Sequence, residues 1–98
     1  MGVTYIGEYA FYECENLTNI KIPTSVTRIE NGSFQASGLK SVEIPEGVTS
    51  IEYYAFSECR NLANVVLPDG LERIGLHAFF YCDSLKEIKI PTSVTSIE

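Results

Sequence analysis

Three cysteines and one histidine are the residues whose side chains could carry out chemistry. Cys14, Cys59 and Cys82 could form a disulfide or bind a metal ion, and His77 could act as a general base. Zinc sites place their ligands at short, recognisable spacings, and the cysteines match none of them. A histidine base needs a nucleophile and an orienting partner, and the sequence offers neither beside His77. We therefore predict no catalytic residue, no metal site and no cofactor, and we expect no enzymatic activity.

The cysteines follow a repeat that extends along the whole chain. Cutting the sequence at each aliphatic-x-x-Ile unit gives repeats at residues 3–25, 26–47, 48–70 and 71–93 and a partial repeat at 94–98. The second repeat is one residue shorter than the others, between Phe34 and Leu39. Because the pattern resumes in phase afterwards, the missing residue is expected to lie in a loop. We expect residues 1–98 to form one domain of stacked repeats.

Six apolar columns and a proline column recur in all four repeats. One of these columns consists of Phe11, Phe34, Phe56 and Phe79. No single repeat can bury its own apolar residues, so stacking must place each residue on its counterpart in the next repeat. The Leu-x-x-Ile-x-Ile-Pro unit alternates at period two, which predicts parallel strands stacked about 4.8 Å apart and ended by the proline. We expect one helical turn in the Ala-Phe-x-x-Cys unit and positive φ at Gly47 and Gly70.

The three cysteines share one column, in which the second repeat has Ser37. Cys59 and Cys82 lie in adjacent repeats, so their Cα atoms could come within disulfide range. Parallel, inward-pointing side chains would nevertheless keep their sulfurs from meeting. The favoured interpretation is a column of buried thiols that act as small hydrophobes, and a disulfide is the alternative.

The complete pattern resembles the BspA-like, or Treponema-type, leucine-rich repeat over residues 3–98. The third repeat fits it through Val48, Ile51, Ala55, Phe56, Cys59, Leu62, Val65, Leu67 and Pro68. In the second repeat, Ser33 replaces alanine and Ser37 replaces cysteine. The resemblance implies a β-rich α/β solenoid, a right-handed superhelix with a parallel β-sheet on its concave face and short strands or helical turns elsewhere. It also implies a surface or secreted protein that adheres to host matrix proteins, host cells or other microbes.

Charge and hydropathy exclude other partners. Seven basic residues against thirteen acidic ones give a net charge of −6, which disfavours binding to nucleic acid and to anionic membrane surfaces. No apolar run approaches the roughly 20 residues that cross a bilayer. Residues 1–4 lack the features of a signal peptide, so the expected location at the cell surface or outside the cell comes from the resemblance alone.

Two sets of residues are candidates for binding a partner protein. The first should face outward from the predicted sheet: Asn19, Lys21, Ser41, Glu43, Asn64, Val66, Glu87 and Lys89. The second is aromatic and falls at variable positions: Tyr9, Tyr12, Tyr53, Tyr54, Phe80 and Tyr81. Aromatic residues are enriched at binding hot spots, although these could instead pack along the loops. The leading hypothesis is a protein-binding module of a bacterial cell-surface, adhesin-like protein. The alternative is an intracellular or structural scaffold with no adhesive role.

The two ends of the predicted stack are a third candidate surface. Residues 3–7 and 94–98 are the same part of the repeat, and neither end shows a capping repeat with a polar outer face. We therefore expect a fragment of a longer array, which would associate end to end when isolated.

Overall fold

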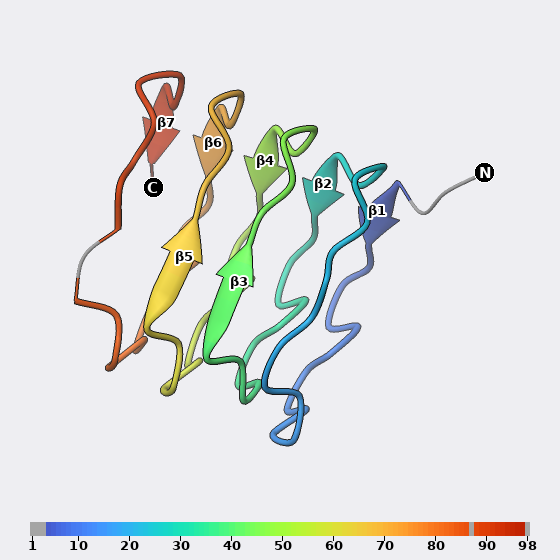
Figure 1. The fold of residues 1–98 in the computed structure, drawn as a ribbon, viewed down its shortest axis with the longest axis vertical. Coiled ribbons are helices and arrows are strands. Elements are labelled where there is room, and N and C mark those ends of the chain that lie inside the picture. Colours follow the sequence, from blue (N-terminus) through green and yellow to red (C-terminus); the bar gives the residue numbers. More distant parts are fainter. Residues whose placement is uncertain (1–3, 87, 98) are drawn as a thin grey trace.

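The computed structural model describes residues 4–86 and 88–97, which form a solenoid of stacked repeats (Figure 1). The strands are short: β1 (Tyr5–Ile6), β2 (Arg28–Ile29), β3 (Ser41–Glu43), β4 (Ser50–Ile51), β5 (Asn64–Val66), β6 (Arg73–Ile74) and β7 (Ser96–Ile97). The described residues contain no helix, and therefore none of a length and hydropathy suited to crossing a membrane.

The larger sheet lies in the Val-x-x-Ile unit. Strands β1, β2, β4, β6 and β7 pair in parallel in that order, and each strand's isoleucine pairs with the isoleucine of the next. Ile6, Ile29, Ile51 and Ile74 point inward and are buried. The sequence-based prediction allowed short strands outside the Leu-x-x-Ile-x-Ile-Pro unit but placed the main sheet in that unit, whereas the larger sheet lies in the Val-x-x-Ile unit.

The second sheet contains only β3 and β5, whose registers are Ser41↔Asn64, Val42↔Val65 and Glu43↔Val66. Pro45 directly follows Ile44, and Pro68 directly follows Leu67. A proline has no N–H to continue the ladder of hydrogen bonds. Among the described residues, which omit residue 87 of the fourth repeat, the sheet predicted along this face pairs in the second and third repeats. Figure 1 shows the arrows of β3 and β5 side by side, below the row of arrows of the five-stranded sheet.

A stack of phenylalanine rings runs through the core. The ring centroids of Phe11 and Phe34, Phe34 and Phe56, and Phe56 and Phe79 are 5.1, 5.2 and 5.5 Å apart, with interplanar angles of 5° or less. Phe34 and Phe56 are completely buried, and Phe11 and Phe79 are half-buried. The predicted superposition of this column is confirmed.

The predicted helical turn is wrong. In the first repeat the N–H groups of Ala10, Tyr12 and Cys14 each donate to the carbonyl three residues earlier, which makes successive reverse turns. The N–H groups of the alternate residues, Tyr9, Phe11 and Glu13, donate to carbonyls of the second repeat instead. An α-helix would direct all of them within the repeat, so bonding between repeats prevents the helix. We call the surface formed by these segments, residues 8–16, 31–38, 53–61 and 76–84, the turn edge.

Candidate functional site

The turn edge is held by two columns of residues in the left-handed backbone conformation. Their members are Tyr9, Gly32, Tyr54 and His77 in the first column and Glu13, Ala36, Glu58 and Tyr81 in the second. All have φ between 55° and 62°. In the first three repeats their N–H groups bond to the next repeat, as with Glu58 to the carbonyl of Phe80 at 2.6 Å. Because this conformation costs about 1–2 kcal/mol per non-glycine residue, stacking of the repeats must maintain it.

The exposed aromatic side chains of the turn edge form two groups. Tyr9 and Tyr12 meet edge to face with centroids 5.5 Å apart. In the last two repeats Tyr54 contacts His77 (5.4 Å), His77 contacts Phe80 (4.5 Å) and Phe80 contacts Tyr81 (4.0 Å).

The structure therefore brings together five of the six aromatic residues predicted from the sequence, in two groups. Tyr9 and Tyr81 are each 52% exposed, so broad ring surface remains in contact with solvent. Tyr53 is also exposed, but within the described residues its ring contacts no other aromatic ring and lies against Gly75.

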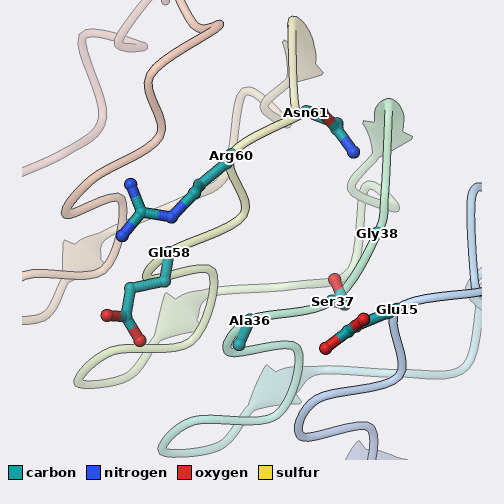
Figure 2. A pocket seen from close by; sticks show the side chains of 7 residues that line it. All are labelled: Glu15, Ala36, Ser37, Gly38, Glu58, Arg60 and Asn61. Atoms are coloured by element: carbon teal, nitrogen blue, oxygen red, sulfur yellow. The ribbon is translucent and has the colours of Figure 1, made fainter.

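A notch divides the two aromatic groups at the short second repeat. It has a volume of about 420 Å³ and is lined by residue 15, residues 36–38, and residues 58, 60 and 61. A Cβ atom on Gly38 would lie 2.0 Å from the carbonyl oxygen of Glu15, so the shortened loop closes tightly on the first repeat. In Figure 2 the side chains of Glu15 and Glu58 lie on either side of Ala36. The missing residue thus leaves a hollow between two full-length loops.

Negative charge is concentrated along the turn edge. Its five acidic residues are Glu8, Glu13, Glu15, Glu58 and Asp83, and its one basic residue is Arg60. Arg60 forms an ion pair with Asp83 at 2.9 Å and lies 5.5 Å from the ring centroid of Tyr81. Within the described residues the four glutamates of the edge have no ion-pair partner, so the surface carries uncompensated negative charge.

The other predicted surface surrounds β3 and β5. Asn19, Lys21, Ser41 and Glu43 line a hollow of about 480 Å³ on one side of the paired strands. Val66 and Lys89 line another of about 370 Å³ on the other side, and Asn64 is exposed on β5. Val66 is 57% exposed, and Glu87 lies outside the described residues. This face has mixed charge and carries no aromatic group among its predicted residues.

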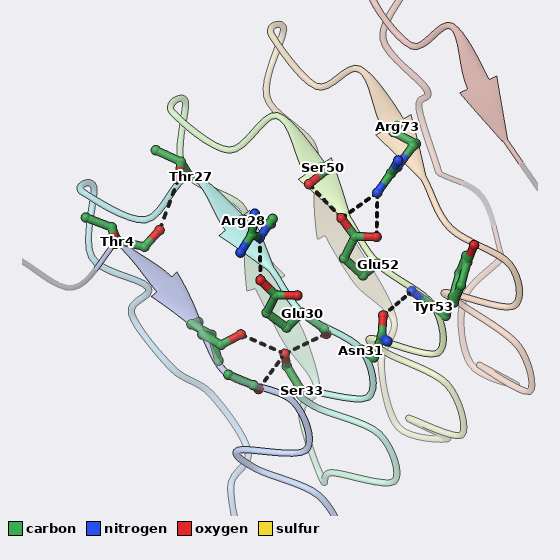
Figure 3. A network of polar contacts seen from close by, with 12 residues as sticks. Thr4, Thr27, Arg28, Glu30, Asn31, Ser33, Ser50, Glu52, Tyr53 and Arg73 are labelled. Carbon is green, nitrogen blue, oxygen red and sulfur yellow. Dashed lines mark hydrogen bonds and ion pairs between the residues drawn. The ribbon is translucent and has the colours of Figure 1, made fainter.

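Polar contacts beside the five-stranded sheet tie successive repeats together (Figure 3). Arg73 donates to both carboxylate oxygens of Glu52, at 2.6 and 2.7 Å, and Ser50 donates to the same carboxylate. Arg28 pairs with Glu30, and the hydroxyl of Ser33 lies within reach of three backbone carbonyls. The repeat pattern gave no sign of this network, because its members fall at variable positions. The polar side chains of this network therefore form their contacts within the chain.

The cysteine column is structural. All three thiols are free, and those of Cys59 and Cys82 donate to the carbonyls of Phe34 and Phe56, at 3.0 and 3.1 Å. Burial raises the pKa of Cys59, and burial together with the nearby Cys59 raises the pKa of Cys82 to about 12. Each of these two thiols is therefore protonated near neutral pH and bridges two repeats, in keeping with the favoured interpretation of the sequence.

Comparisons with known proteins agree with this architecture. Residues 1–98 match the family described as BspA type leucine rich repeat region (6 copies), whereas no curated protein matches the chain. Similar solved structures include leucine-rich repeat proteins from T. pallidum (35% identity, TM-score 0.94) and Bacteroides ovatus (43%, 0.88). A leucine rich cell surface protein from Faecalibacterium prausnitzii is 32% identical, with a TM-score of 0.67.

Fold and repeat define a leucine-rich-repeat solenoid, a class of scaffold used for protein–protein interaction. Within that class, the chain belongs to the BspA-type leucine-rich repeat family. Each of the three alignments covers 97% of this chain, but only 45%, 25% and 32% of the T. pallidum, B. ovatus and F. prausnitzii chains respectively. The chain thus spans less than half the length of these relatives.

Proposed function

We propose that this chain is a protein-binding module of a bacterial cell-surface, adhesin-like protein, and that its partner docks on the turn edge. The family, and the F. prausnitzii relative that is a leucine rich cell surface protein, support the surface location. The clustered, exposed aromatic side chains support the choice of surface, and they are the observation on which the proposal depends.

The aromatic side chains favour the turn edge over the face of β3 and β5. Aromatic side chains offer large contact areas and lose little conformational entropy on binding, which is why they dominate binding hot spots. The left-handed backbone at Tyr9 and Tyr54 is fixed by N–H bonds to the next repeat, so these side chains start from an ordered backbone. Such preorganisation lowers the free-energy cost of association. The face of β3 and β5 also has a hydrogen-bonded backbone, but its small and mixed-charge side chains lack the aromatic contact area, so the aromatic side chains distinguish the two surfaces.

The proposal is tested by measuring binding of the chain to immobilised matrix proteins, epithelial cells and other bacteria. One variant changes the turn edge through Tyr12→Ser, Phe80→Ser and Tyr81→Ser. A matched control, which also leaves the net charge unchanged, alters the other face through Asn19→Ser, Asn64→Ser and Val66→Ser. We expect the first variant to lose binding by roughly tenfold or more and the second to stay within about twofold of the original chain. The opposite ranking would assign binding to the face of β3 and β5.

The surface location has a separate test on intact bacteria that carry the parent protein. We expect external protease to cleave the repeat region while a cytoplasmic marker remains whole. Full protection of the repeats, together with no binding to any extracellular surface, would favour the intracellular scaffold.

We also propose that the isolated chain associates end to end. Phe11 and Leu17 in the first repeat and Phe79 and Leu85 in the fourth are half-buried, whereas Phe and Leu are completely buried at these positions in the two central repeats. These apolar side chains of the first and fourth repeats would be covered if one chain stacked on another, since solenoid repeats are stabilised by their neighbours.

A further inference from the structure

We propose that the partner segment recognised by the turn edge is basic: an extended, arginine-rich stretch of polypeptide that crosses the notch at the second repeat. This inference rests on the proposed function and names the chemistry of its partner. It is carried by three features: the charge of the edge, the chain's own arginine–tyrosine contacts and the shape of the notch.

The charge of the edge selects a cation. Glu8, Glu13, Glu15 and Glu58 have no ion-pair partner within the described residues, and they lie among exposed tyrosines. Complementary charge accelerates encounter and rejects partners of the wrong sign. An acidic protein, a nucleic acid or a sulfated glycan would be repelled here, whereas a basic segment would be attracted.

The chain itself shows how such a cation would be held. Arg60 places its guanidinium 5.5 Å from the ring centroid of Tyr81 and pairs with Asp83. Arg28 repeats the arrangement with the ring of Tyr5, 6.0 Å away, and with Glu30. Both pairs combine a tyrosine face with a carboxylate. Tyr9 and Tyr12, beside the glutamates of the first repeat, offer the same two components without the arginine.

Arginine fits these components better than lysine does. Its planar guanidinium can stack on a tyrosine ring while it donates two parallel hydrogen bonds to a carboxylate, whereas an ammonium group cannot adopt that geometry. The preference for arginine over lysine is therefore a specific part of the proposal.

The notch provides a path for the bound segment. Its floor is formed by the small residues at 36–38, and carboxylates of the first and third repeats stand on its two sides (Figure 2). Figure 2 also shows Arg60 extending away from Ser37, toward the fourth repeat with which it pairs. Alternate side chains of an extended segment project to one side about 6.6 Å apart. Successive repeats are spaced by 5.1 and 5.2 Å at the phenylalanine rings, so the first and third repeats lie farther apart than two such side chains. Two arginines of a segment lying along the stack could reach Glu15 and Glu58 if their long side chains diverge.

The test uses blocked peptides of alternating sequence, (Arg-Ser)₄ and (Lys-Ser)₄, titrated into the chain labelled with ¹⁵N. We expect amide shifts confined to the turn edge, tighter binding of the arginine peptide, and weaker binding as salt is raised. Equal affinity for both peptides, or shifts centred on the face of β3 and β5, would overturn the proposal.

Two pairs of substitutions separate local recognition from net charge. Glu15→Gln with Glu58→Gln should weaken binding of the arginine peptide by roughly tenfold. Glu43→Gln with Glu72→Gln makes the same change in charge elsewhere and should alter affinity by less than about twofold in physiological salt. Equal losses in both pairs would reduce the interaction to non-specific attraction and refute the site.

A third variant tests the shape of the notch without changing the charge. One serine inserted between Ser37 and Gly38 restores the length of the other repeats and should fill the hollow, lowering affinity while both glutamates remain. The ¹⁵N spectrum reports whether this variant folds, and the glutamine variants decide the question if it does not. Failure of the arginine peptide to bind, while the aromatic variant still loses binding to matrix proteins or cells, would reject the basic partner and leave the proposed function intact.

Discussion

At the scale of single residues, the least expected feature is the left-handed backbone of the turn edge. The sequence suggested positive φ at Gly47 and Gly70, but among the described glycines only Gly32 has it. The other members of its column are Tyr9, Tyr54 and His77, which favour other conformations as isolated residues. Bonding between repeats imposes this geometry, so single-residue preference could not predict it. The signal available in the sequence was Gly32, because a glycine at one position of the column indicates that the whole column could have positive φ.

Ala36 allows the cost of this backbone to be measured. It has a φ of 60°, so Ala36→Gly relieves a steric penalty, and we expect stability to rise by about 0.5–1 kcal/mol after the added entropy of the unfolded chain is subtracted. Ala63 is exposed and is not among the positive-φ residues, so Ala63→Gly should lower stability by about 0.5–1 kcal/mol. Urea denaturation of both variants checks the difference in sign. Equal destabilisation would show that Ala36 is not strained.

The buried thiols predict a loss of stability at alkaline pH. The folded-state pKa of Cys82 is about 12, above its ordinary value of 9.0, and that of Cys59 is also raised. Their contribution is therefore complete below about pH 9 and declines above it, as the thiols of the unfolded chain ionise first. Between about pH 8 and pH 10.5 the urea midpoint should fall more in the original chain than in the Cys59→Ser, Cys82→Ser variant. Parallel declines in the two proteins would contradict this.

At the scale of elements, the sequence predicted which residues face inward but not which segments pair as strands. The apolar columns led directly to the phenylalanine stack and to the buried isoleucines of β1, β2, β4 and β6. Every side of a solenoid has a similar spacing between repeats, so an apolar column does not reveal whether its backbone forms a ladder. The two-residue strands of the larger sheet are also too short to show alternation in a sequence.

The phenylalanine stack should account for a large part of the stability. Phe56 is completely buried between Phe34 and Phe79, and Phe56→Ala should cost about 3–5 kcal/mol. That is a large fraction of the roughly 5–15 kcal/mol that stabilises a typical domain. Phe80 directly follows Phe79 in the sequence but is exposed, and Phe80→Ala should cost less than about 1 kcal/mol. Thermal unfolding followed by circular dichroism compares them, and similar losses would show that the stack is not the main source of stability.

At the scale of the whole molecule, stacking gathers residues that the sequence separates. The net charge was known from composition, but its concentration beside exposed tyrosines became visible only when four turn segments were placed on one edge. The one-residue deletion was recognised as a loop change. The notch could not be predicted from it, because the hollow depends on the loops of the first and third repeats standing above the second.

Association of the isolated chain is a prediction at this scale. Light scattering coupled to size-exclusion chromatography should show an apparent mass above 10.9 kDa that increases with concentration. Phe11→Glu should lower it, because a charge in the half-buried first ring opposes stacking of a second chain. A strict monomer at every concentration would rule out the end-to-end contact.

The hydrogen bonds between repeats run in the direction in which the repeats stack, and this has a mechanical consequence. A pull on the two termini loads these bonds one repeat at a time, as in opening a zipper, instead of shearing many at once. Each repeat that detaches should release roughly 70 Å of chain, given about 3.3 Å per extended residue. We expect single-molecule stretching to show a series of small, evenly spaced steps, so that a tether under flow would lengthen gradually and absorb sudden load without releasing its anchorage.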